Sequence, residues 1–484
     1  MAPESPSRRR PDLRLGAALA AAKLTSSGIR ALGRGGGTAA PGLLADRLDP
    51  ALLAKLTARL PRGVVVVAGT NGKTTVSRMV ADVLEADGLR VIHNRSGSNL
   101  VRGVAAAFAA HASVGGDPRG EIGVIETDEA AFPEIVRLVS PRVVVLNNLF
   151  RDQLDRYGEL DAIATKWRTA LATLPDTATL VVNVDDPALA ALADGIAARR
   201  LAFGLDEERH RLAALPHAAD AATCRRCGAD LVHDALYVSH LGAWRCPRCG
   251  LARPPLDVAG RRIELHGVES LRLRVGLDRP LDDGGQPRAL DVAVGVPGLY
   301  NAYNAVAATA AAHALGAGDA AIVRALSAFR SAFGRIERVQ FRDRALTMAL
   351  VKNPVGFNEV LRMLTGGEGS TLSVPTMIAI NDLAADGRDV SWLWDVDFEL
   401  LAGGTAPLFA AGLRGPDMAN RLRYAGVPPD RLTLLLGDLP AALETFVAAV
   451  PQGTAAYVLP TYTAMLDLRR ALASLGAVET FWKQ

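Results

Sequence analysis

The chain has 484 residues, of which 49% are hydrophobic and 22% charged, and its formal net charge is +3. Its length corresponds to roughly three ordinary domains, and its composition is that of a globular protein rather than an extended disordered chain. A net charge this small excludes a strong electrostatic attraction to nucleic acid or to an acidic membrane.

Residues 1–60 predict a helical segment without a membrane anchor. No stretch offers the roughly 18 consecutive apolar residues that a membrane span needs. Arg14 and Lys23 bracket an alanine-rich stretch that no clean cleavage site follows, which is unlike a secretory signal. We expect a cytoplasmic protein that begins with two short amphipathic helices. The glycine-rich run 33–38 joins them, either as a flexible connector or as a close backbone approach.

Residues 61–328 alternate short β-branched runs with helical stretches, which predicts βαβ units and a parallel sheet covered on both faces. The expected strands are Val64–Val67, Arg90–Ile92, Ile122–Ile125, Val143–Leu146, Leu180–Val184, 262–276 and 289–296. The expected helices are 74–87, 101–112 and 301–314. The alternation stops near residue 210, so we predict an insertion over about 216–256.

Residues 329–484 predict a second, smaller, Rossmann-like α/β unit. Strands are expected at Thr347–Val351 and Thr376–Ile380, with a helix at Gly356–Leu364 between them. The glycine-rich stretch Thr365–Ser373 is typical of a surface loop. The predicted fold class is therefore α/β in both units.

The strongest chemical signal lies between the first predicted strand and the helix that follows it. There the sequence reads Gly69, Thr70, Asn71, Gly72, Lys73, Thr74 and Thr75. Glycines in such a loop let backbone N–H groups face phosphate oxygens, at a helix N-terminus that favours negative charge. Lys73 is expected at the β- and γ-phosphates of ATP and Thr74 at Mg²⁺. The loop is a shortened variant, because Val67 stands where the full pattern has a glycine.

Two carboxylates, Glu126 and Asp128, come at the end of the predicted strand Ile122–Ile125. In an open α/β sheet, ligands bind at the carboxyl ends of the strands, and the phosphate loop lies at that same edge. We therefore predict that Glu126 is a catalytic residue that holds Mg²⁺ or substrate. Capping of the following helix is the alternative role for Asp128.

The four cysteines, Cys224, Cys227, Cys246 and Cys249, form two CxxC pairs. Four thiolates suit a structural Zn²⁺ site with no open position for catalysis. Either pair alone would also suit a redox dithiol. Zinc ribbons can bind nucleic acid too, but this sequence has no wider basic or aromatic face beside the cysteines for that function. Because the chain has only 4 cysteines, zinc binding leaves no thiol to attack glutamine. An enzyme of this chain that uses glutamine must then obtain ammonia from another polypeptide.

Together these motifs resemble the Mur ligase family, ATP-dependent enzymes that form amide bonds in peptidoglycan synthesis. The matching pieces run in family order: Gly69–Thr75, Glu126, Asn147-Asn148, Asp152–Asp155, Asn183–Pro187, Gly298–Ala305 and Gly334–Glu337. The resemblance implies that Asn301 and Arg335 lie near the adenine and phosphates of ATP. It also implies that a substrate carboxyl becomes an acyl phosphate, which an amine then attacks.

Two departures narrow the resemblance to one branch of the family. Gln153 stands where typical members have histidine, and residues 349–354 read Ala-Leu-Val-Lys-Asn-Pro instead of Asp-Tyr-Ala-His-Asn-Pro. With the cysteine insertion, the chain is similar to the MurT branch. The C-terminal motifs that support this are 352–359, 381–382, 386–397 and 461–465.

The MurT resemblance implies amidation of the D-glutamate α-carboxyl in the lipid II stem peptide. The ammonia would come from a GatD-type class-I glutamine amidotransferase, and the substrate would place the protein peripherally at the inner face of the membrane. Nucleic acid is not an expected partner. The implied cofactors are ATP, Mg²⁺ and structural Zn²⁺.

An aspartate of this chain is implied to complete the partner's Cys–His pair, because an acid that orients a histidine is the third member of a triad. Asp395 is the predicted residue and Asp389 the runner-up, with Asp397 in the same acidic stretch. Trp392 and Trp394 beside them suit a partner interface. The alternative is that both tryptophans are core residues and the acids are solvated caps.

Two other functions fit the same motifs. One is an amino-acid-adding Mur or folylpolyglutamate-type ligase, which would incorporate an amino acid instead of ammonia. The other is a non-enzymatic, nucleotide-gated zinc-ribbon binding protein. Lys166 is the candidate for the lysine that many Mur ligases carbamylate, and a plain surface lysine is the alternative.

Overall fold

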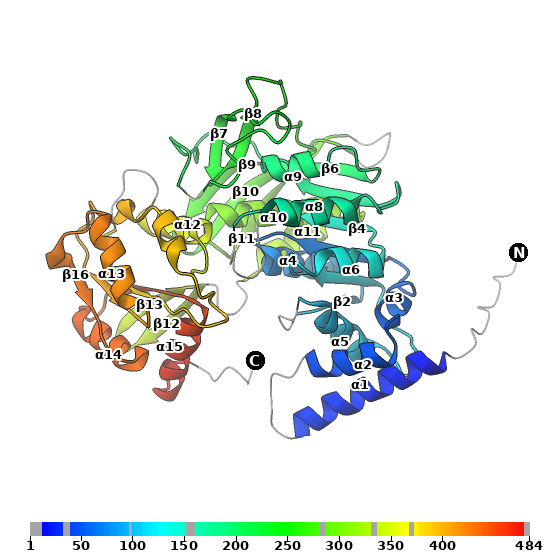
Figure 1. Cartoon of the computed structure of the whole chain (residues 1–484), viewed down its shortest axis with the longest axis horizontal. Coiled ribbons are helices and arrows are strands. Elements are labelled where there is room, and N and C mark those ends of the chain that lie inside the picture. Colours follow the sequence, from blue (N-terminus) through cyan, green and yellow to red (C-terminus); the bar gives the residue numbers. More distant parts are fainter. Residues whose placement is uncertain are drawn as a thin grey trace, which may run out of the picture.

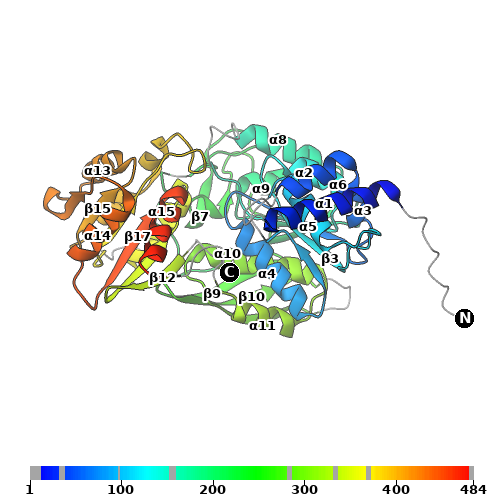
Figure 2. The same ribbon diagram turned by 90° about the horizontal axis from the view of Figure 1, so that it is seen from below.

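The chain folds into two α/β units that lie side by side in both views (Figures 1 and 2). In this computed structural model, the structure describes residues 12–31, 39–95, 99–151, 160–217, 219–280, 286–330, 336–366 and 372–478. Each unit has its own sheet with helices on both faces. We propose the boundary between the units at residue 328.

A nine-stranded sheet, counted over the described residues, forms the centre of the first unit in the order β11-β10-β9-β6-β5-β4-β1-β3-β2. Its strands are β1 Val64–Ala68, β2 Val91–His93, β3 Ile122–Glu126, β4 Val143–Leu146, β5 Thr179–Asn183, β6 Arg199–Leu205, β9 Val258–His266, β10 Ser270–Leu277 and β11 Arg288–Val294. Strands β1, β3 and β4 are buried along their whole length, as expected of parallel strands covered on both faces. The predicted parallel sheet is confirmed for β1 to β6.

The far edge of this sheet corrects the prediction of a single strand over 262–276. That stretch is divided between β9 and β10, which turn near Gly267 and pair antiparallel, and β11 pairs antiparallel with β10. In β10, Leu271, Leu273 and Val275 are buried, whereas the arginines between them are not. This alternation suits antiparallel strands with one covered face.

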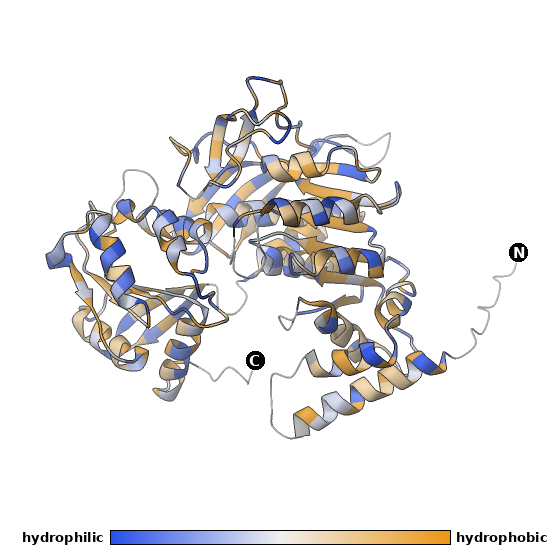
Figure 3. Ribbon diagram, viewed as in Figure 1, coloured by the Kyte–Doolittle hydropathy of each residue, from blue (hydrophilic) through white to orange (hydrophobic). Residues whose placement is uncertain are grey.

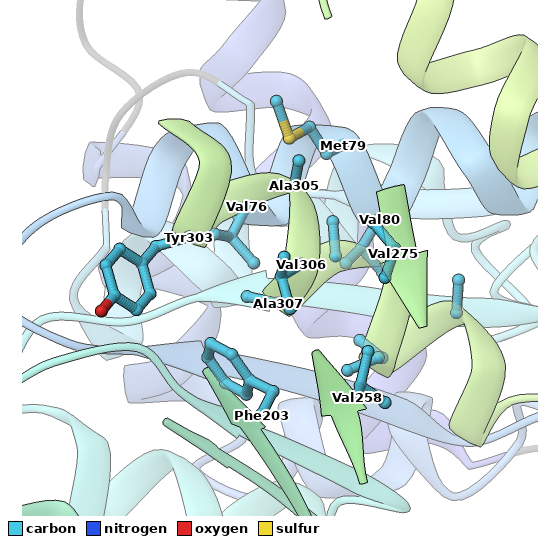
Figure 4. Packing of buried hydrophobic residues seen from close by; sticks show 14 of the residues in the cluster. Val76, Met79, Val80, Phe203, Val258, Val275, Tyr303, Ala305, Val306 and Ala307 are labelled. Carbon is cyan, nitrogen blue, oxygen red and sulfur yellow. The ribbon is translucent and has the colours of Figure 1, made fainter. Parts of the chain in front are cut away.

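Helices on the two faces of the central sheet form two separate hydrophobic clusters. One face carries α4 Lys73–Ala86, α10 Leu299–Ala314 and α11 Asp319–Ala328. Figure 4 shows side chains of α4 and α10 meeting strand residues such as Phe203 and Val258. The other face carries α5 Val101–His111, α6 Phe132–Val139, α8 Leu160–Leu171 and α9 Pro187–Leu192. Figure 3 shows the hydrophobic strands between these helices.

The N-terminal segment has three described helices, so the prediction of two short ones is wrong. They are α1 Leu13–Ala31, α2 Ala39–Leu48 and α3 Leu52–Thr57, and α1 alone has 19 residues. They pack against α5 and α6, and Leu15 and Leu19 belong to the same hydrophobic cluster as α5. The predicted connector 33–38 lies outside the described residues. No helix in the described ranges is long and apolar enough to cross a membrane.

The insertion between β6 and β9 contains a two-stranded antiparallel hairpin. Its strands are β7 Val232–Val238 and β8 Leu241–Arg245. The cysteine pairs lie on either side of this hairpin, because Cys227 precedes β7 and Cys246 directly follows β8. The hairpin therefore connects the two halves of the predicted metal site.

The second unit has a six-stranded sheet, counted over the described residues, in the order β12-β13-β17-β14-β15-β16. Its strands are β12 Ile336–Phe341, β13 Arg344–Ala349, β14 Thr376–Ala379, β15 Leu408–Ala411, β16 Leu432–Leu434 and β17 Ala455–Pro460. Pairing is parallel except between β12 and β13. Its helices are α12 Pro354–Thr365, α13 Gly415–Tyr424, α14 Leu439–Ala449 and α15 Tyr462–Ser474, with 3₁₀ turns η1 Ser391–Asp395, η2 Phe398–Leu401 and η3 Pro429–Arg431. Most of the predicted loop 365–373 lies outside the described residues.

Candidate functional site

The predicted phosphate loop connects β1 to α4 at the carboxyl edge of the central sheet. Gly72 has φ +84° and immediately precedes the first residue of α4, Lys73. A side chain at Gly72 would collide with the amides of Asn147 and Asn304. Glycine is therefore required here both by the backbone conformation and by the close approach of β4 and α10.

Residues that follow β4 fix the conformation of the loop. The Thr70 amide donates to the carbonyl of Asn148 at 3.0 Å, and the Asn71 amide donates to Asn148 Oδ1 at 2.8 Å. The Thr70 hydroxyl accepts from the Phe150 amide at 3.0 Å and donates to its carbonyl at 3.1 Å. These bonds pre-organise the loop before any ligand arrives.

Charged and hydroxyl side chains converge beside the loop. Lys73 Nζ lies 2.9 Å from Glu129 Oε1, and the Thr74 hydroxyl donates to Glu126 Oε1 at 2.9 Å. Asn94 holds the backbone of Glu126 by accepting from its amide and donating to its carbonyl, each at 2.9 Å. The Thr74 and Glu126 oxygens are ligands of the kind that Mg²⁺ prefers. Glu129 is a loop partner that the sequence did not single out.

Asp128 lies beside this cluster but serves the local turn. Its carboxylate accepts from the Ala130 amide at 3.1 Å, and its carbonyl accepts from the Phe132 amide at 2.9 Å at the start of α6. The helix α6 itself begins after Ala131 without a side-chain cap, so Asp128 orders the turn before the helix and the capping alternative is not confirmed.

The predicted adenine residue Asn301 reaches the loop through a second asparagine. Asn301 donates to the carbonyl of Pro297 at 2.6 Å and accepts from Asn304 Nδ2 at 2.9 Å. Asn304 Oδ1 in turn accepts from Asn147 Nδ2 at 3.2 Å. Asn304 thus contacts the loop directly, and its place one turn after Asn301 on α10 was the sequence signal for it. The other predicted residue, Arg335, lies outside the described residues.

A cavity of about 120 Å³ adjoins the loop between the two units. Its wall contains residues of the loop, of α10, of the β7–β8 hairpin and of the second unit: Asn71, Gly72, Asn148, Phe150, Val238, Leu241, Tyr300, Tyr303, Asn304, Leu350, Lys352, Asn353, Val355, Gly356, Glu359 and Val360. Burial raises the pKa of Glu359, which Arg362 partly opposes. Apolar walls with a few amide groups are typical of a small-molecule site.

Asn353 joins the second unit to the phosphate loop. Its Nδ2 donates to Asn71 Oδ1 at 3.0 Å, while its Oδ1 caps α12 by accepting from the Gly356 amide at 2.9 Å. The side-chain nitrogen of its partner, Asn71 Nδ2, is buried and has no hydrogen-bond partner among the described residues. Asn71 lines the cavity, and buried polar groups are rarely left unpaired, so this atom is suited to bind a polar ligand. Asn147 Oδ1 also lacks a described partner, but Asn147 is not among the residues that line the cavity.

The four cysteines meet in space as predicted. All four Sγ atoms lie within 4.8 Å of one another, with Cys224 and Cys249 3.6 Å apart and Cys227 and Cys246 3.4 Å apart. Tetrahedral Zn²⁺ with bonds of about 2.3 Å needs sulfurs about 3.8 Å apart, so the geometry fits the metal. Without metal the thiols share protons unequally: the backbone amide of Cys249 lowers the pKa of Cys246 to about 6, whereas, against the lowering effect of the Ala229 amide, burial and the neighbouring thiols raise the pKa of Cys227 to about 11.

Comparisons with known proteins identify the family. The description "Mur ligase middle domain" fits residues 67–225 and "MurT ligase C-terminal" fits residues 350–465. A lipid II isoglutaminyl synthase (glutamine-hydrolyzing) subunit MurT from Streptococcus pneumoniae R6 is 34% identical over 442 residues, 91% of this chain and 93% of the relative. The subunit of the same name from Staphylococcus aureus COL is 30% identical over 93% of this chain and 96% of the relative. The chain belongs to the MurT family.

As a MurT family member, the chain is an ATP-dependent ligase, and the non-enzymatic alternative is wrong. Solved structures confirm the Mur-ligase-like fold. A pseudomurein peptide ligase type C from Methanothermus fervidus has a TM-score of 0.64 at 18% identity, covering 88% of this chain and 80% of that one. A MurF ligase from Thermotoga maritima in complex with ADP has a TM-score of 0.59 at 14% identity, covering 87% and 82%.

The three aspartates of the acidic stretch, Asp389, Asp395 and Asp397, lie in different surroundings in this MurT chain. Asp395 Oδ2 lies 3.7 Å from Arg151 Nη2 of the central unit. Asp397 pairs with Arg362 at 3.0 Å and with His217 at 3.1 Å. Asp389 instead binds the first residue of η1: the Ser391 amide donates to its carboxylate and lowers its pKa.

The two tryptophans of the stretch differ as well. Trp394 is 52% exposed and stacks edge-on against exposed Tyr424 with ring centroids 5.4 Å apart. Trp392 is half-buried against Phe357. The core alternative therefore fails for Trp394, which is available to a partner.

Lys166, a further predicted position, is not among the residues that line the cavity. Lys166 is exposed on α8, next to the buried Trp167, which agrees with the plain surface alternative. Residues 152–155, which include Gln153, lie outside the described residues.

Proposed function

We propose that this MurT chain amidates the α-carboxyl of D-glutamate in the lipid II stem peptide, spending ATP and using ammonia from a GatD-type glutaminase subunit. The observation that carries the proposal is the cavity between the units, where the phosphate loop of one unit meets Asn353 of the other at 3.0 Å. The names of the relatives, which are subunits of a glutamine-hydrolyzing lipid II isoglutaminyl synthase, support the substrate.

The nucleotide is proposed to lie across the loop with its base in the cavity. The unpaired Asn71 Nδ2, in the wall of the cavity, offers a donor to a polar ligand edge. Phe150, Tyr300 and Tyr303 in the wall offer apolar area to a planar ring. Lys73 would exchange Glu129 for phosphate oxygens, because both partners are anionic and lie at the loop.

The reaction has two balanced steps. A carboxylate oxygen of the substrate attacks the γ-phosphorus, ADP leaves, and an acyl phosphate forms. The nitrogen of ammonia then attacks the acyl carbon, phosphate leaves, and a proton passes from nitrogen to a base. Mg²⁺ held by Thr74 and Glu126 would neutralise charge on the phosphates. Lys73 would stabilise the transferred phosphoryl group, which depends mainly on position and charge.

Ammonia must come from elsewhere, since all 4 cysteines of the chain meet in one metal-type cluster. Asp395, with Asp389 as the runner-up, is the proposed acid for the histidine of the partner's active site. Exposed Trp394 and Tyr424 lie near it and suit the same interface. The lipid-linked substrate would place the complex peripherally at the inner face of the membrane.

An amidation assay tests the proposal. The chain would be purified with a class-I glutaminase subunit and supplied with lipid II, Mg²⁺ and ATP, then with glutamine or ammonium chloride. We expect one amide per ATP with either nitrogen source, and amidation from glutamine only in the presence of the partner. Incorporation of an amino acid instead of ammonia would support the amino-acid-adding alternative and overturn the proposal.

A further inference from the structure

The β7–β8 hairpin of the cysteine insertion reaches the wall of the nucleotide cavity. Val238 at the end of β7 and Leu241 at the start of β8 both line it, beside Asn71 and Gly72 of the phosphate loop. A two-stranded hairpin is marginally stable on its own, so something must hold this one in place. Its position therefore matters for the shape of the site.

Two contacts fasten the hairpin to the end of β5. The Gly242 amide donates to the carbonyl of Asp185 at 3.0 Å, and Trp244 Nε1 donates to the carbonyl of Val184 at 3.0 Å. Cys246 follows β8 immediately, and Arg253 beyond the second cysteine pair donates its amide to the carbonyl of Trp244 at 2.9 Å. The contact of Trp244 with residue 184 therefore lies next to the metal end of the hairpin, whereas the contact of Gly242 with residue 185 lies next to its turn.

The side chain of Asp185 continues this connection to α10. Its Oδ1 accepts from Arg253 at 2.8 Å, and its Oδ2 accepts from the Tyr303 hydroxyl at 2.7 Å and from the Leu205 amide at 2.8 Å. Asp185 is completely buried. Tyr303 also lines the cavity, and Figure 4 shows its ring projecting from α10 with the phenol oxygen at the far end.

We propose that the zinc-ribbon insertion is a positioning element of the nucleotide site. Zinc held by the cysteines fixes β8 and Arg253, Arg253 and Gly242 fix Asp185, and Asp185 fixes the Tyr303 ring against the nucleotide base. Asp185 and Arg253 are thus positioning residues that act through Tyr303, and metal loading sets the affinity for ATP. This inference rests on the proposed nucleotide site in the cavity.

The bonding pattern supports action at a distance rather than a purely local structural role. Asp185 receives donors from β6, from the exit of the insertion and from α10, so it connects three separate segments. Removing one partner of a buried charged group leaves the others poorly paired. Loss of the metal or of the Arg253 side chain should therefore change how firmly the Tyr303 ring is held.

The decisive variant is Tyr303→Phe in the full-length chain, with Tyr457→Phe as its matched control. Tyr457 is half-buried on β17 of the second unit and does not line the cavity. We expect Tyr303→Phe to weaken the binding of a fluorescent ATP analogue about tenfold. The KM for ATP should rise with little change in kcat, and Tyr457→Phe should leave both unchanged. Wild-type affinity in Tyr303→Phe would overturn the inference.

Metal removal is the second part of the experiment. The affinity for the ATP analogue is measured on the zinc-free chain and on the same chain reloaded with zinc, with circular dichroism as the check on folding. Zinc removal should weaken binding by a similar factor, reloading should restore it, and in Tyr303→Phe the further loss should be small because both changes act on one connection. Equal affinity with and without zinc, or fully additive losses, would contradict the inference.

Arg253→Met decides the matter if the zinc-free chain does not stay folded. This variant should retain one zinc per chain by mass spectrometry yet bind the analogue more weakly, and Arg253→Lys should recover part of the affinity. Unchanged affinity in Arg253→Met would overturn the inference. Lys73→Ala separates it from the proposed function: if Lys73→Ala also binds the analogue normally, the nucleotide site itself is misplaced.

Discussion

The two sheets of the molecule end in different polar surroundings at their carboxyl edges. At the central edge, buried charged and hydroxyl groups form pairs that a ligand can replace, such as Lys73 with Glu129 at 2.9 Å. At the edge of the second sheet, Asp386 accepts from the amide of Thr463 at 2.8 Å, and the Asn381 amide donates to the Thr461 hydroxyl at 3.0 Å.

The difference separates two tasks within similar α/β architectures. Lys73 already pairs with one anion at the central edge, so under the proposed function it would exchange that partner for a phosphate oxygen. Asp386 is satisfied by neutral donors of its own unit, so the second edge is a fixed scaffold that presents Asn353 and Lys352 to the cavity. The first unit supplies the phosphate loop, and the second completes the enclosure with residues that include Asn353 and Lys352.

The largest expected effect comes from removing the mobile cation. Lys73→Ala should lower the rate of ATP-dependent amidation at least about a thousandfold, because the transferred phosphoryl group loses its cation. Steady-state assays with ammonium chloride measure this directly. Exposed Lys166→Ala is the matched control and should retain the wild-type rate. Substantial activity in Lys73→Ala would show that the central edge does not hold the phosphates.

The second largest effect is expected from removing the Thr74 hydroxyl, which faces Glu126. Thr74→Val keeps the shape of the side chain and removes the 2.9 Å bond to the carboxylate. We expect the rate to fall about a hundredfold and the Mg²⁺ requirement to rise, because a metal ligand is lost. Thr74→Ser keeps the hydroxyl and should stay within a few-fold of wild type. A Thr74→Val enzyme with the normal Mg²⁺ dependence would exclude this threonine from the metal site.

The two units should also differ in their sensitivity to acid. All 8 histidines lie in the first unit, since none follows His313 in the sequence. Burial lowers the pKa of His93 on β2 to about 4, and neither ring nitrogen has a hydrogen-bond partner among the described residues. The unfolded chain then binds the proton more readily than the folded one. Stability is complete above the unfolded pKa of 6.5 and falls as the pH drops toward 4.

Denaturant titrations at pH 7 and pH 5 measure this effect. The contribution of His93 to the free energy of unfolding should fall by about 2 kcal/mol between these pH values. His93→Leu should remove that part of the loss, whereas His111→Gln, at an exposed position on α5, should not. An unchanged pH dependence in His93→Leu would assign the acid sensitivity to other groups.

The smallest effect concerns the contact between the units. Asn353→Ala removes the bond to Asn71 and the cap of α12, and should raise the KM for ATP about fivefold. The free energy of unfolding should fall by about 1 kcal/mol through the lost cap. Asp438→Ala removes the cap of α14 in the same unit and should give a similar loss of stability with an unchanged KM. Equal KM values in the two variants would mean that Asn353 acts only as a cap.

Local chemistry explains what could be predicted from the sequence. The loop around Lys73 and the cysteine pairs are contiguous motifs whose spacing already determines their geometry, and the buried valine runs of β1 and β4 determine a covered sheet. The predictions that failed involved pairing direction and helix number, where distant partners decide the outcome. Alternation in β10, for example, allows either direction until its neighbours are known.

The rest of the candidate site depends on contacts between distant parts of the chain. Asn353 and Asn71 are separated by 282 positions, and Asp185 and Tyr303 by 118. Each of these side chains is ordinary in its own segment, as an N-cap, a loop amide or a helix residue. All four lie in motifs of the sequence, but no local pattern says which side chains pair with which, so only the folded arrangement shows that they meet.

Arg151 has a consequence for a chain that works beside a second subunit. Its guanidinium attracts both Asp220 of the insertion and Asp395 of the second unit. If Asp395 serves a histidine on another polypeptide, that histidine must compete with a resident positive charge for the same oxygen atoms. Because the two side chains are 41% and 39% exposed and 3.7 Å apart, that competition would be weak, and an arriving histidine could take the carboxylate at little cost.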